Sequence, residues 1–202
     1  MTEDEARAWT AARFDSEAIG RLDRLAAIVA AETQRQNLIA GSTVDAIWAR
    51  HIVDSLQLVA LGPEGMWLDI GTGAGFPGLA VAAVEPEREM ILVEPRRLRA
   101  DYLRNAADSL GLGHVTVIAA KVEAVREKAK VISARAVSRI DALLASAVQC
   151  SNNETIWLLP KGRNADEEVA EARRTWHGVF HVEQSITNPD SAIVIARGVR
   201  RR

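Results

Sequence analysis

The chain has 202 residues, of which 48% are hydrophobic and 26% are charged, and its formal net charge is −2. These values are typical of a soluble globular protein with one domain, or one domain and an appendage. They exclude a generally basic nucleic-acid binder, so any RNA contact must come from a local basic patch.

Residues 1–62 are predicted to form an N-terminal helical extension. Apolar residues recur at helical spacing in its first half, at Leu22, Leu25, Ile28 and Val29. Ser42 and Thr43 are predicted to cap a second helix, whose apolar positions lie between Ile47 and Val59. The segment Leu61-Gly62-Pro63 then breaks the chain.

Residues 63–202 are predicted to form a doubly wound α/β domain. Short apolar runs follow one another at Met66–Ile70, Met90–Glu94, His114–Ala119, Val131–Ala134, Thr155–Pro160, Val179–Gln184 and Ala192–Ala196. Helix-like stretches such as Arg97–Leu110 and Arg139–Gln149 separate the first five, which is typical of a parallel sheet with crossover helices. The last two flank Asn188-Pro189-Asp190 and are predicted to form an antiparallel hairpin.

The strongest local motif is the segment Trp67–Gly78, in which closely spaced glycines follow an apolar strand. Glycine allows a tight turn and lets a ligand approach the backbone without a Cβ in the way. Asp69 lies just before the turn, at the edge of the sheet where ligands bind in such folds. Pro77 suits the first turn of the helix that follows. The segment is therefore predicted to be a cofactor-binding turn.

Two cofactors compete for this turn. The spacing from Gly73 to Gly78 matches the dinucleotide fingerprint G-x-G-x-x-G. The other register is Asp69-x-Gly71-x-Gly73-x-Gly75, an acid followed by alternating glycines, which resembles motif I of class I methyltransferases. In a dinucleotide site the first glycine closely follows the strand, whereas other residues intervene here. The turn therefore favours S-adenosylmethionine, whose positive sulfonium and amino groups Asp69 would attract directly or through water.

Two further positions are predicted to bind the nucleoside part of the cofactor. Glu94 ends the next predicted strand, where a carboxylate accepts hydrogen bonds from ribose hydroxyls. Both candidate cofactors contain a ribose, so Glu94 does not distinguish them, and a solvated acid at a strand end is the alternative. After the third predicted strand, Val122 would flank the adenine ring and backbone groups near Glu123 would bind its exocyclic amine.

Five segments occur in the order found in one protein family. They are Asn37-Leu38, Arg50-His51-Ile52-Val53-Asp54-Ser55, Asp69–Gly78, Val131–Val137 and Leu159-Pro160-Lys161-Gly162. Together they resemble the ribosomal RNA small-subunit methyltransferase G family, also called the glucose-inhibited division protein B family, over about residues 20–198. Glu32, where many members have tryptophan, and the stretch Pro95–Arg99 depart from the family pattern. These departures affect the expected RNA docking more than the cofactor site.

The resemblance implies a class I methyltransferase with a Rossmann-like, seven-stranded, doubly wound sheet and an N-terminal helical extension. It implies methyl transfer from S-adenosylmethionine to N7 of one guanine in the decoding-region loop of 16S rRNA, with the small ribosomal subunit as partner. It also implies that a set of residues contacts the cofactor, namely Gly71, Phe76, Val122, Glu123 and Arg135. Arg135 and Lys161 are expected to border the substrate pocket.

Methylation at N7 needs no general base, because the in-plane lone pair of this nitrogen carries no proton. We therefore expect catalysis by proximity and orientation, and the sequence offers no evident Ser-His-Asp triad or cysteine nucleophile. A cation beside N7 would disfavour the charged product, but one that holds O6 or a phosphate would orient the guanine. Arg135 and Lys161 are the candidates for this role.

Substrate binding is expected from a helix face and from basic residues. His51, Asp54 and Ser55 share one helix face, which either covers the cofactor mouth, with His51 and Asp54 hydrogen-bonded, or packs the helix on the sheet. The first basic group is Arg96, Arg97, Arg99 and Arg104, and the second is Arg197, Arg200, Arg201 and Arg202. Each group either binds RNA or is a solvated surface. The substrate-binding candidates are His51, Arg96, Arg97 and Arg99.

Three other functions share parts of this pattern. A methyltransferase of small molecules or proteins would use the same cofactor residues. A non-enzymatic RNA-binding assembly factor would keep the fold, although the intact Asp69, glycines and Glu94 argue against a decayed site. A nicotinamide oxidoreductase would need a substrate domain and a catalytic acid pair, which the sequence does not show.

Export signals and metal-binding patterns are not evident. No apolar run approaches the roughly 20 residues that span a bilayer, and the acidic segment MTEDEARAWT does not resemble a secretory signal. Cys150 is the single cysteine, so we expect it to pack as a small apolar side chain. The histidines lack metal-ligand spacing. A cytoplasmic, monomeric protein without a metal is therefore expected.

Overall fold

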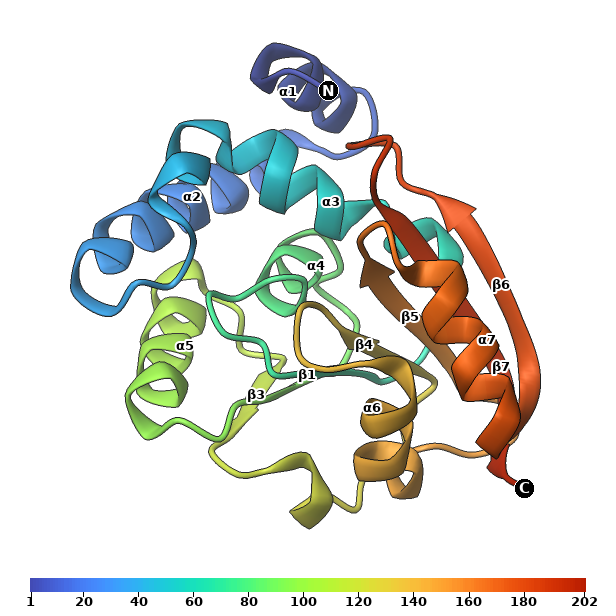
Figure 1. Cartoon of the computed structure of the whole chain (residues 1–202). Helices are drawn as coiled ribbons and strands as arrows, with labels where there is room; N and C mark the ends of the chain where they lie inside the picture. The colour runs from blue at the N-terminus through green and yellow to red at the C-terminus, as the bar shows by residue number, and fades with distance from the viewer.

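A seven-stranded sheet forms the centre of the molecule in the computed structural model, which describes residues 1–202 (Figure 1). The strands are β1 (Trp67–Ile70), β2 (Met90–Val93), β3 (Val115–Ile118), β4 (Val131–Ala134), β5 (Ile156–Lys161), β6 (Trp176–Gln184) and β7 (Ala192–Arg201). Their order is β3-β2-β1-β4-β5-β7-β6, with β1 to β5 parallel and β7 antiparallel to both neighbours. The predicted parallel sheet and terminal hairpin are confirmed.

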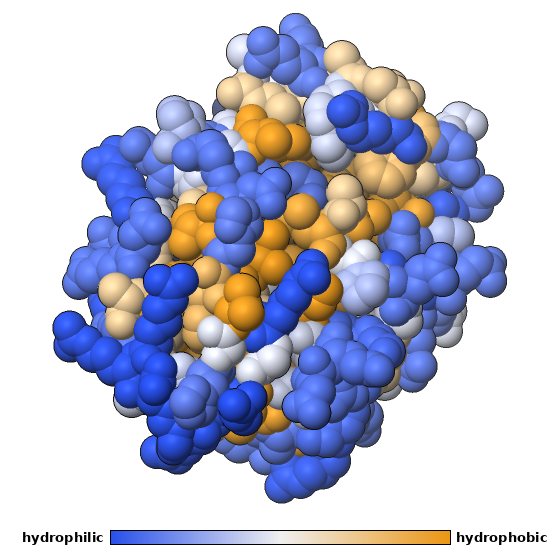
Figure 2. All heavy atoms as spheres, turned by 90° about the vertical axis from the view of Figure 1, so that its right-hand side faces the viewer, coloured by the Kyte–Doolittle hydropathy of each residue, from blue (hydrophilic) through white to orange (hydrophobic).

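The hairpin strands are longer than the sequence predicted. β6 begins at Trp176 and β7 continues to Arg201, because the two strands pair with each other along almost their whole length. β6 is the edge strand, and only Trp176 and Phe180 in it are buried, so its first residues do not form an apolar run. Figure 2 shows the side of the molecule that this edge strand forms, where hydrophilic atoms surround a central hydrophobic area. The sequence therefore predicted β6 from Val179 onward and missed its first three residues.

Helices cover both faces of the sheet, as a doubly wound fold requires (Figure 1). α4 (Gly78–Val84) and α5 (Arg97–Leu110) share a hydrophobic cluster with one face, and α6 (Ile140–Ala147) and α7 (Ala165–Thr175) share a second cluster with the other. Side chains of successive strand residues enter the two clusters in turn, Met90 and Leu92 on one side and Ile91 and Val93 on the other. The predicted helix over 97–110 is confirmed, and the one predicted over 139–149 ends earlier, at Ala147.

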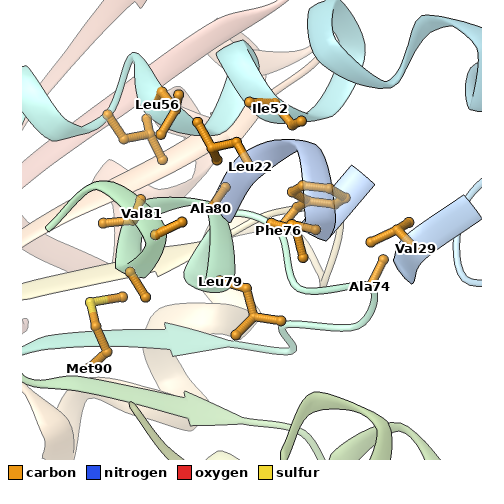
Figure 3. Packing of buried hydrophobic residues seen from close by; sticks show 14 of the residues in the cluster. Leu22, Val29, Ile52, Leu56, Ala74, Phe76, Leu79, Ala80, Val81 and Met90 are labelled. Carbon is orange, nitrogen blue, oxygen red and sulfur yellow. The ribbon is translucent and has the colours of Figure 1, made fainter. Parts of the chain in front are cut away.

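The N-terminal helices complete the first cluster. They are α1 (Glu3–Ala11), α2 (Ser16–Gln36) and α3 (Val53–Leu56), and a single π-helical turn (Trp48–Ile52) leads into α3. Helices α2 and α3 pack on α4, and α1 packs on α2, α3 and the turn before α3. Figure 3 shows side chains of α2 and of the α3 region directed toward α4 and the glycine turn. Leu22 and Val29 are fully buried, as their spacing predicted. None of the helices is long and apolar enough to cross a membrane.

The predicted caps Ser42 and Thr43 are wrong. Both residues lie inside a 3₁₀ helix (Gly41–Ala46) and neither side chain caps a helix. The carboxylate of Glu3 takes this role, because it accepts hydrogen bonds from the backbone N–H groups of Trp48 at 3.2 Å and Ala49 at 2.7 Å. A carboxylate at the start of a helix binds its free N–H groups as well as a neighbouring hydroxyl does. The cap comes from a distant segment, which local sequence cannot indicate.

Replacing Leu22 with alanine is expected to lower the free energy of unfolding by about 2–5 kcal/mol, because Leu22 is fully buried and a cavity would remain. Denaturant titration measures this loss. Ile28 lies on the same helix and is only half-buried, so Ile28→Ala should have a clearly smaller effect. Equal losses in the two variants would contradict the packing of α2 against the first cluster.

Candidate active site

A cavity of about 810 Å³ opens at the carboxyl ends of β1, β4 and β5. The glycine turn after β1, the loop after β4, the end of β5 and the segment that precedes α3 contribute to its walls. Ligand sites in proteins commonly measure about 300–1,000 Å³ and lie at this edge of a parallel sheet. Cavity size and position therefore suit a cofactor together with part of a second substrate.

The glycine turn has the left-handed backbone that glycine favours. Gly71, Gly73 and Gly75 have φ values of +66°, +58° and +101°. Gly71 and Gly73 line the cavity, so a ligand can reach their backbone. Gly75 faces inward instead, where a Cβ would lie 2.7 Å from Leu79 Cδ1. Two of the predicted cofactor glycines thus border the cavity, and the third allows the turn to pack on α4.

Asp69 lies beneath the turn and is fully buried. Its Oδ2 accepts a hydrogen bond from the backbone N–H of Gly78 at 3.0 Å, and its Oδ1 accepts one from the hydroxyl of Ser133 at 2.6 Å. Ser133 in turn accepts a hydrogen bond from the indole of Trp67 at 2.8 Å. The carboxylate therefore ties β1 to β4 and to the start of α4, and it holds the turn rather than lining the cavity. Pro77 immediately precedes α4 instead of lying within its first turn.

Burial raises the pKa of Asp69 from the usual 3.8 to about 6, against the opposing effect of hydrogen bonds from Ser133, Thr72 and Gly78. Between about pH 4 and pH 6 the folded protein therefore keeps a proton that the unfolded chain has released. We expect the free energy of unfolding, relative to Asp69→Asn, to fall by roughly 3 kcal/mol at most as pH rises through this window. Denaturant titrations across the window measure it, and a difference that increases with pH would contradict the raised pKa.

Glu94 supports the turn from the side of β2. It is 4% exposed, and its two carboxylate oxygens accept hydrogen bonds from the backbone N–H groups of Gly73 at 3.1 Å and Arg96 at 3.0 Å. The side chain lies directly after β2 at the carboxyl edge, as the sequence predicted. In this structure its carboxylate joins the turn to the start of α5.

Arg135 connects the loop after β4 to the π-helical turn and to α3. Its guanidinium donates hydrogen bonds to Asp54 Oδ2 at 3.1 Å, to His51 Nδ1 at 3.1 Å and to the backbone carbonyl of Arg50 at 3.3 Å. It also lies over the ring of Phe76, 5.4 Å from the ring centre. His51 stacks on the same ring, with the ring centres 5.3 Å apart. Arg135, His51 and Phe76 therefore form one rigid wall of the cavity.

His51 is neutral in this wall. Burial, followed by the charges of Arg135 and Arg50, lowers its pKa to about 3. Neutral imidazole has one donor and one acceptor, so Nδ1 accepts from Arg135 and Nε2 donates to the hydroxyl of Thr43 at 2.9 Å. The predicted hydrogen bond between His51 and Asp54 does not form, because Arg135 lies between the two side chains and binds both. Ser55, on the predicted face, is buried and donates to the carbonyl of His51.

Lys161 lines the cavity at the end of β5 and forms an ion pair with Glu168 of α7, with 2.9 Å between Nζ and Oε2. Its Nζ also donates to the carbonyl of Ser138 at 2.6 Å. Sequence reasoning missed Glu168, which is one of several acidic residues in the first turn of α7. Its pairing with Lys161 depends on how α7 packs beside β5, and no local motif records that.

The remaining candidates lie around the cavity or apart from it. Arg99 is half-buried and lines the cavity, whereas Arg96 and Arg97 are exposed at the start of α5. Val122 is buried and Glu123 exposed in a 3₁₀ turn (Val122–Ala124) that follows β3 and lies outside the cavity. Cys150 is fully buried, as predicted. The structure thus brings together the turn, Phe76, Arg135, Lys161, His51 and Arg99, but not the predicted adenine residues.

Comparisons with known proteins show the family and the fold of this chain. A family model described as rRNA small subunit methyltransferase G matches residues 18–193. A relative of that name from Novosphingobium aromaticivorans is 46% identical, covering 98% of this chain and 89% of its own. Another, from Rhizorhabdus wittichii, is 47% identical, covering 100% of this chain and 95% of its own. The glycopeptide N-methyltransferase MtfA, solved with S-adenosylmethionine, shares the fold with a TM-score of 0.63 at 10% identity, over 72% of this chain and 86% of its own.

Proposed function

This chain belongs to the rRNA small subunit methyltransferase G family, and we propose that it transfers a methyl group from S-adenosylmethionine to N7 of a guanine in 16S rRNA. The observation that supports this best is the cavity shared by the glycine turn and the Arg135 wall. In this cavity the glycine turn, which would bind the cofactor, lies beside a second compartment that charged side chains such as Arg135 and Lys161 line. The proposed substrate places the enzyme in the cytoplasm, at the small ribosomal subunit.

The residues of the cavity fit S-adenosylmethionine. Gly71 and Gly73 present backbone without side chains, and a Cβ on Gly71 would lie 2.6 Å from Val137 Cγ2, so the turn is closed by the loop after β4. Asp69 and Glu94 hold this turn from below. We assign Gly71, Gly73 and Phe76 to cofactor contact, with Asp69, Gly75 and Glu94 shaping the turn. Val122 and Glu123, which follow β3 at the same edge of the sheet, are assigned to the adenine end.

The chemistry requires orientation more than proton transfer. When bound, S-adenosylmethionine supplies an electrophilic methyl group on a positively charged sulfur. The N7 lone pair forms the new bond to this carbon, the carbon–sulfur electron pair returns to sulfur, and no proton moves. The protein must therefore hold the guanine plane in line with the methyl group. Arg135 serves this role by fixing the wall of the second compartment, since its guanidinium is already bound to Asp54 and His51.

RNA binding is assigned to the basic residues beside the cavity. Arg99 borders the cavity, and Arg96 and Arg97 are exposed next to it, at a helix start whose N–H groups no side chain caps. Phosphate contacts made by arginines position a nucleic acid without reading its sequence. Because the net charge of the chain is −2, RNA would be attracted to this basic patch and not to the protein surface as a whole. Replacing these arginines should weaken RNA binding, and the binding that remains should depend less on salt concentration.

The test is methyl transfer to small-subunit rRNA that lacks this modification. We expect the purified protein to label 16S rRNA, naked or in the small subunit, with a methyl group from S-adenosylmethionine. Chemical cleavage at N7-methylguanine should then give one stop in the decoding-region loop. A stop at another nucleotide, or a methyl group on another atom, would contradict N7 of this guanine as the target. Cofactor binding without any transfer to RNA would favour a methyltransferase of another substrate or an RNA-binding assembly factor.

A further inference from the structure

We propose that Glu168 and Lys161 recognise the target base as guanine, Glu168 by accepting hydrogen bonds from its N1–H and 2-amino group and Lys161 by donating one to O6. This inference rests on the proposed function and assigns the specificity of the same site. Both side chains line the cavity that the glycine turn borders. They are 14% and 10% exposed, respectively, so they are largely removed from bulk water and still reachable from the cavity.

The ion pair leaves unused hydrogen-bonding capacity on both partners. Glu168 Oε2 lies 2.9 Å from Lys161 Nζ in an ion pair and accepts a hydrogen bond from the backbone N–H of Ile140 at 2.9 Å, while Oε1 accepts no hydrogen bond from the protein. The ammonium of Lys161 has three N–H groups; one donates to the carbonyl of Ser138, and the ion pair with Glu168 occupies at most one more. The free carboxylate oxygen of Glu168, which can accept two hydrogen bonds, and a free N–H of Lys161 therefore remain side by side in the cavity.

This arrangement matches guanine and opposes adenine. Guanine presents the acceptor O6 beside the donors N1–H and the 2-amino group. Adenine presents the donor 6-amino group beside the acceptor N1, so the lysine would meet a donor and the carboxylate a lone pair. A site built to bind specific donors and acceptors strongly rejects an analogue that leaves them unpaired. The N7 edge stays free for the methyl group, because both side chains contact other atoms of the base.

The paired charges also suit the reaction. Positive charge moves onto the guanine ring during transfer, which makes N1–H a stronger donor. Its hydrogen bond to the Glu168 carboxylate therefore strengthens toward the transition state, and interactions that strengthen in this way accelerate the chemical step. Lys161 alone would oppose the developing charge near O6, but the carboxylate 2.9 Å from its Nζ compensates the ammonium. The pair can thus donate to O6 without adding a net positive charge.

The decisive experiment compares Glu168→Gln with wild type on two RNAs that differ in one atom group. One 16S rRNA fragment carries guanosine at the target, and the other carries inosine, which lacks the 2-amino group. Single-turnover rates give a guanosine-to-inosine ratio for each protein, and comparing the ratios cancels the lower intrinsic reactivity of inosine. Loss of a hydrogen bond to a charged group corresponds to about a tenfold to hundredfold effect. We expect the ratio to fall by about this factor in Glu168→Gln.

The matched control is Glu167→Gln on the same helix. Its side chain is 72% exposed and lies 4.0 Å from Arg139, so it should keep the wild-type ratio. A purely structural role of Glu168, through Ile140 and Lys161, would lower both rates equally and leave the ratio unchanged, which would overturn the proposal. Equilibrium binding of the two RNAs with S-adenosylhomocysteine present should show the same change in preference without catalysis.

Wild-type protein gives a second test that does not depend on the folding of a variant. A fragment with 1-methylguanosine at the target keeps N7 and O6 but blocks N1–H, and we expect its affinity and transfer rate to fall at least tenfold. Undiminished transfer would overturn the proposal. If wild type fails to methylate even the guanosine fragment or the small subunit, the proposed function itself fails, and the inference with it. If wild type methylates the guanosine fragment but Glu168→Gln keeps the wild-type guanosine-to-inosine ratio, only the role of Glu168 is rejected.

Discussion

Replacing Arg135 with alanine is expected to lower kcat/KM for methyl transfer to rRNA by about two orders of magnitude, while the protein remains folded. The guanidinium holds Asp54, His51 and the ring of Phe76 in one wall of the cavity. Without it, the carboxylate of Asp54 keeps only neutral partners, among them Thr187 and Gln57. Misplacement of a reacting group by about 1 Å can cost a hundredfold in rate.

Arg135→Lys should recover only part of this loss. Lysine keeps the charge, but its ammonium is a point charge that cannot form a planar fork between Asp54 and His51 or lie flat over the ring of Phe76. We expect its activity to fall between those of Arg135→Ala and wild type. Single-turnover transfer, cofactor affinity and thermal unfolding should be measured together, so that lost activity is separated from lost fold.

A distant arginine provides the control for these variants. Arg35 has a 78% exposed side chain that pairs only with Glu32 on the surface of α2, so Arg35→Ala should change turnover by less than about threefold. If Arg135→Ala is folded and works at the same rate as this control, Arg135 has no part in positioning the substrate.

Much of the fold follows from local sequence because the parallel strands β1, β2, β4 and β5 are buried on both faces. A strand such as β1 or β2 must then be a short apolar run, and the helices between such runs have one apolar face. Buried strands and long amphipathic helices are therefore visible in the sequence. The first residues of β6, from Trp176 to Gly178, and the cap that Glu3 provides are not, since only Trp176 of these strand residues is buried and the cap joins residues far apart in the chain.

The sequence predicted the part of the site that lies within one segment. It did not predict the contacts between residues of different strands and helices. The glycine turn lies within a few residues, and its positive φ angles explain why glycines recur there. The placement of Asp69 depends instead on Ser133 of another strand, which buries the carboxylate and directs it away from the cavity. The pairing of Lys161 with Glu168 likewise requires the packing of α7. Sequence types identify candidate groups, and the tertiary contacts decide which of them reach a ligand.

Replacing Gly78 with alanine should have the largest effect on stability. A Cβ there would lie 2.3 Å from Leu92 Cδ2 and 2.8 Å from Asp69 Oδ2, and such contacts are impossible without movement. The backbone N–H of Gly78 is also the donor that binds Asp69 Oδ2. Overpacking costs about 1–3 kcal/mol, and a buried carboxylate that loses a donor costs a similar amount. We expect a loss of about 3–5 kcal/mol in the free energy of unfolding.

The same change should weaken S-adenosylmethionine binding, because the movement that relieves the clash displaces the start of α4 and the turn that Asp69 holds. Denaturant titration and calorimetric binding measure the two effects. A Cβ added at Gly113 would meet no atom within 4 Å, and this glycine lies outside the cavity, so Gly113→Ala should leave both quantities within about 0.5 kcal/mol of wild type. Leu92→Val would shorten the clashing side chain and should restore part of the stability of Gly78→Ala. If Gly78→Ala were as stable as Gly113→Ala, the close packing of α4 against Asp69 and β2 would be refuted, and with it the reason why this turn can form a cofactor site.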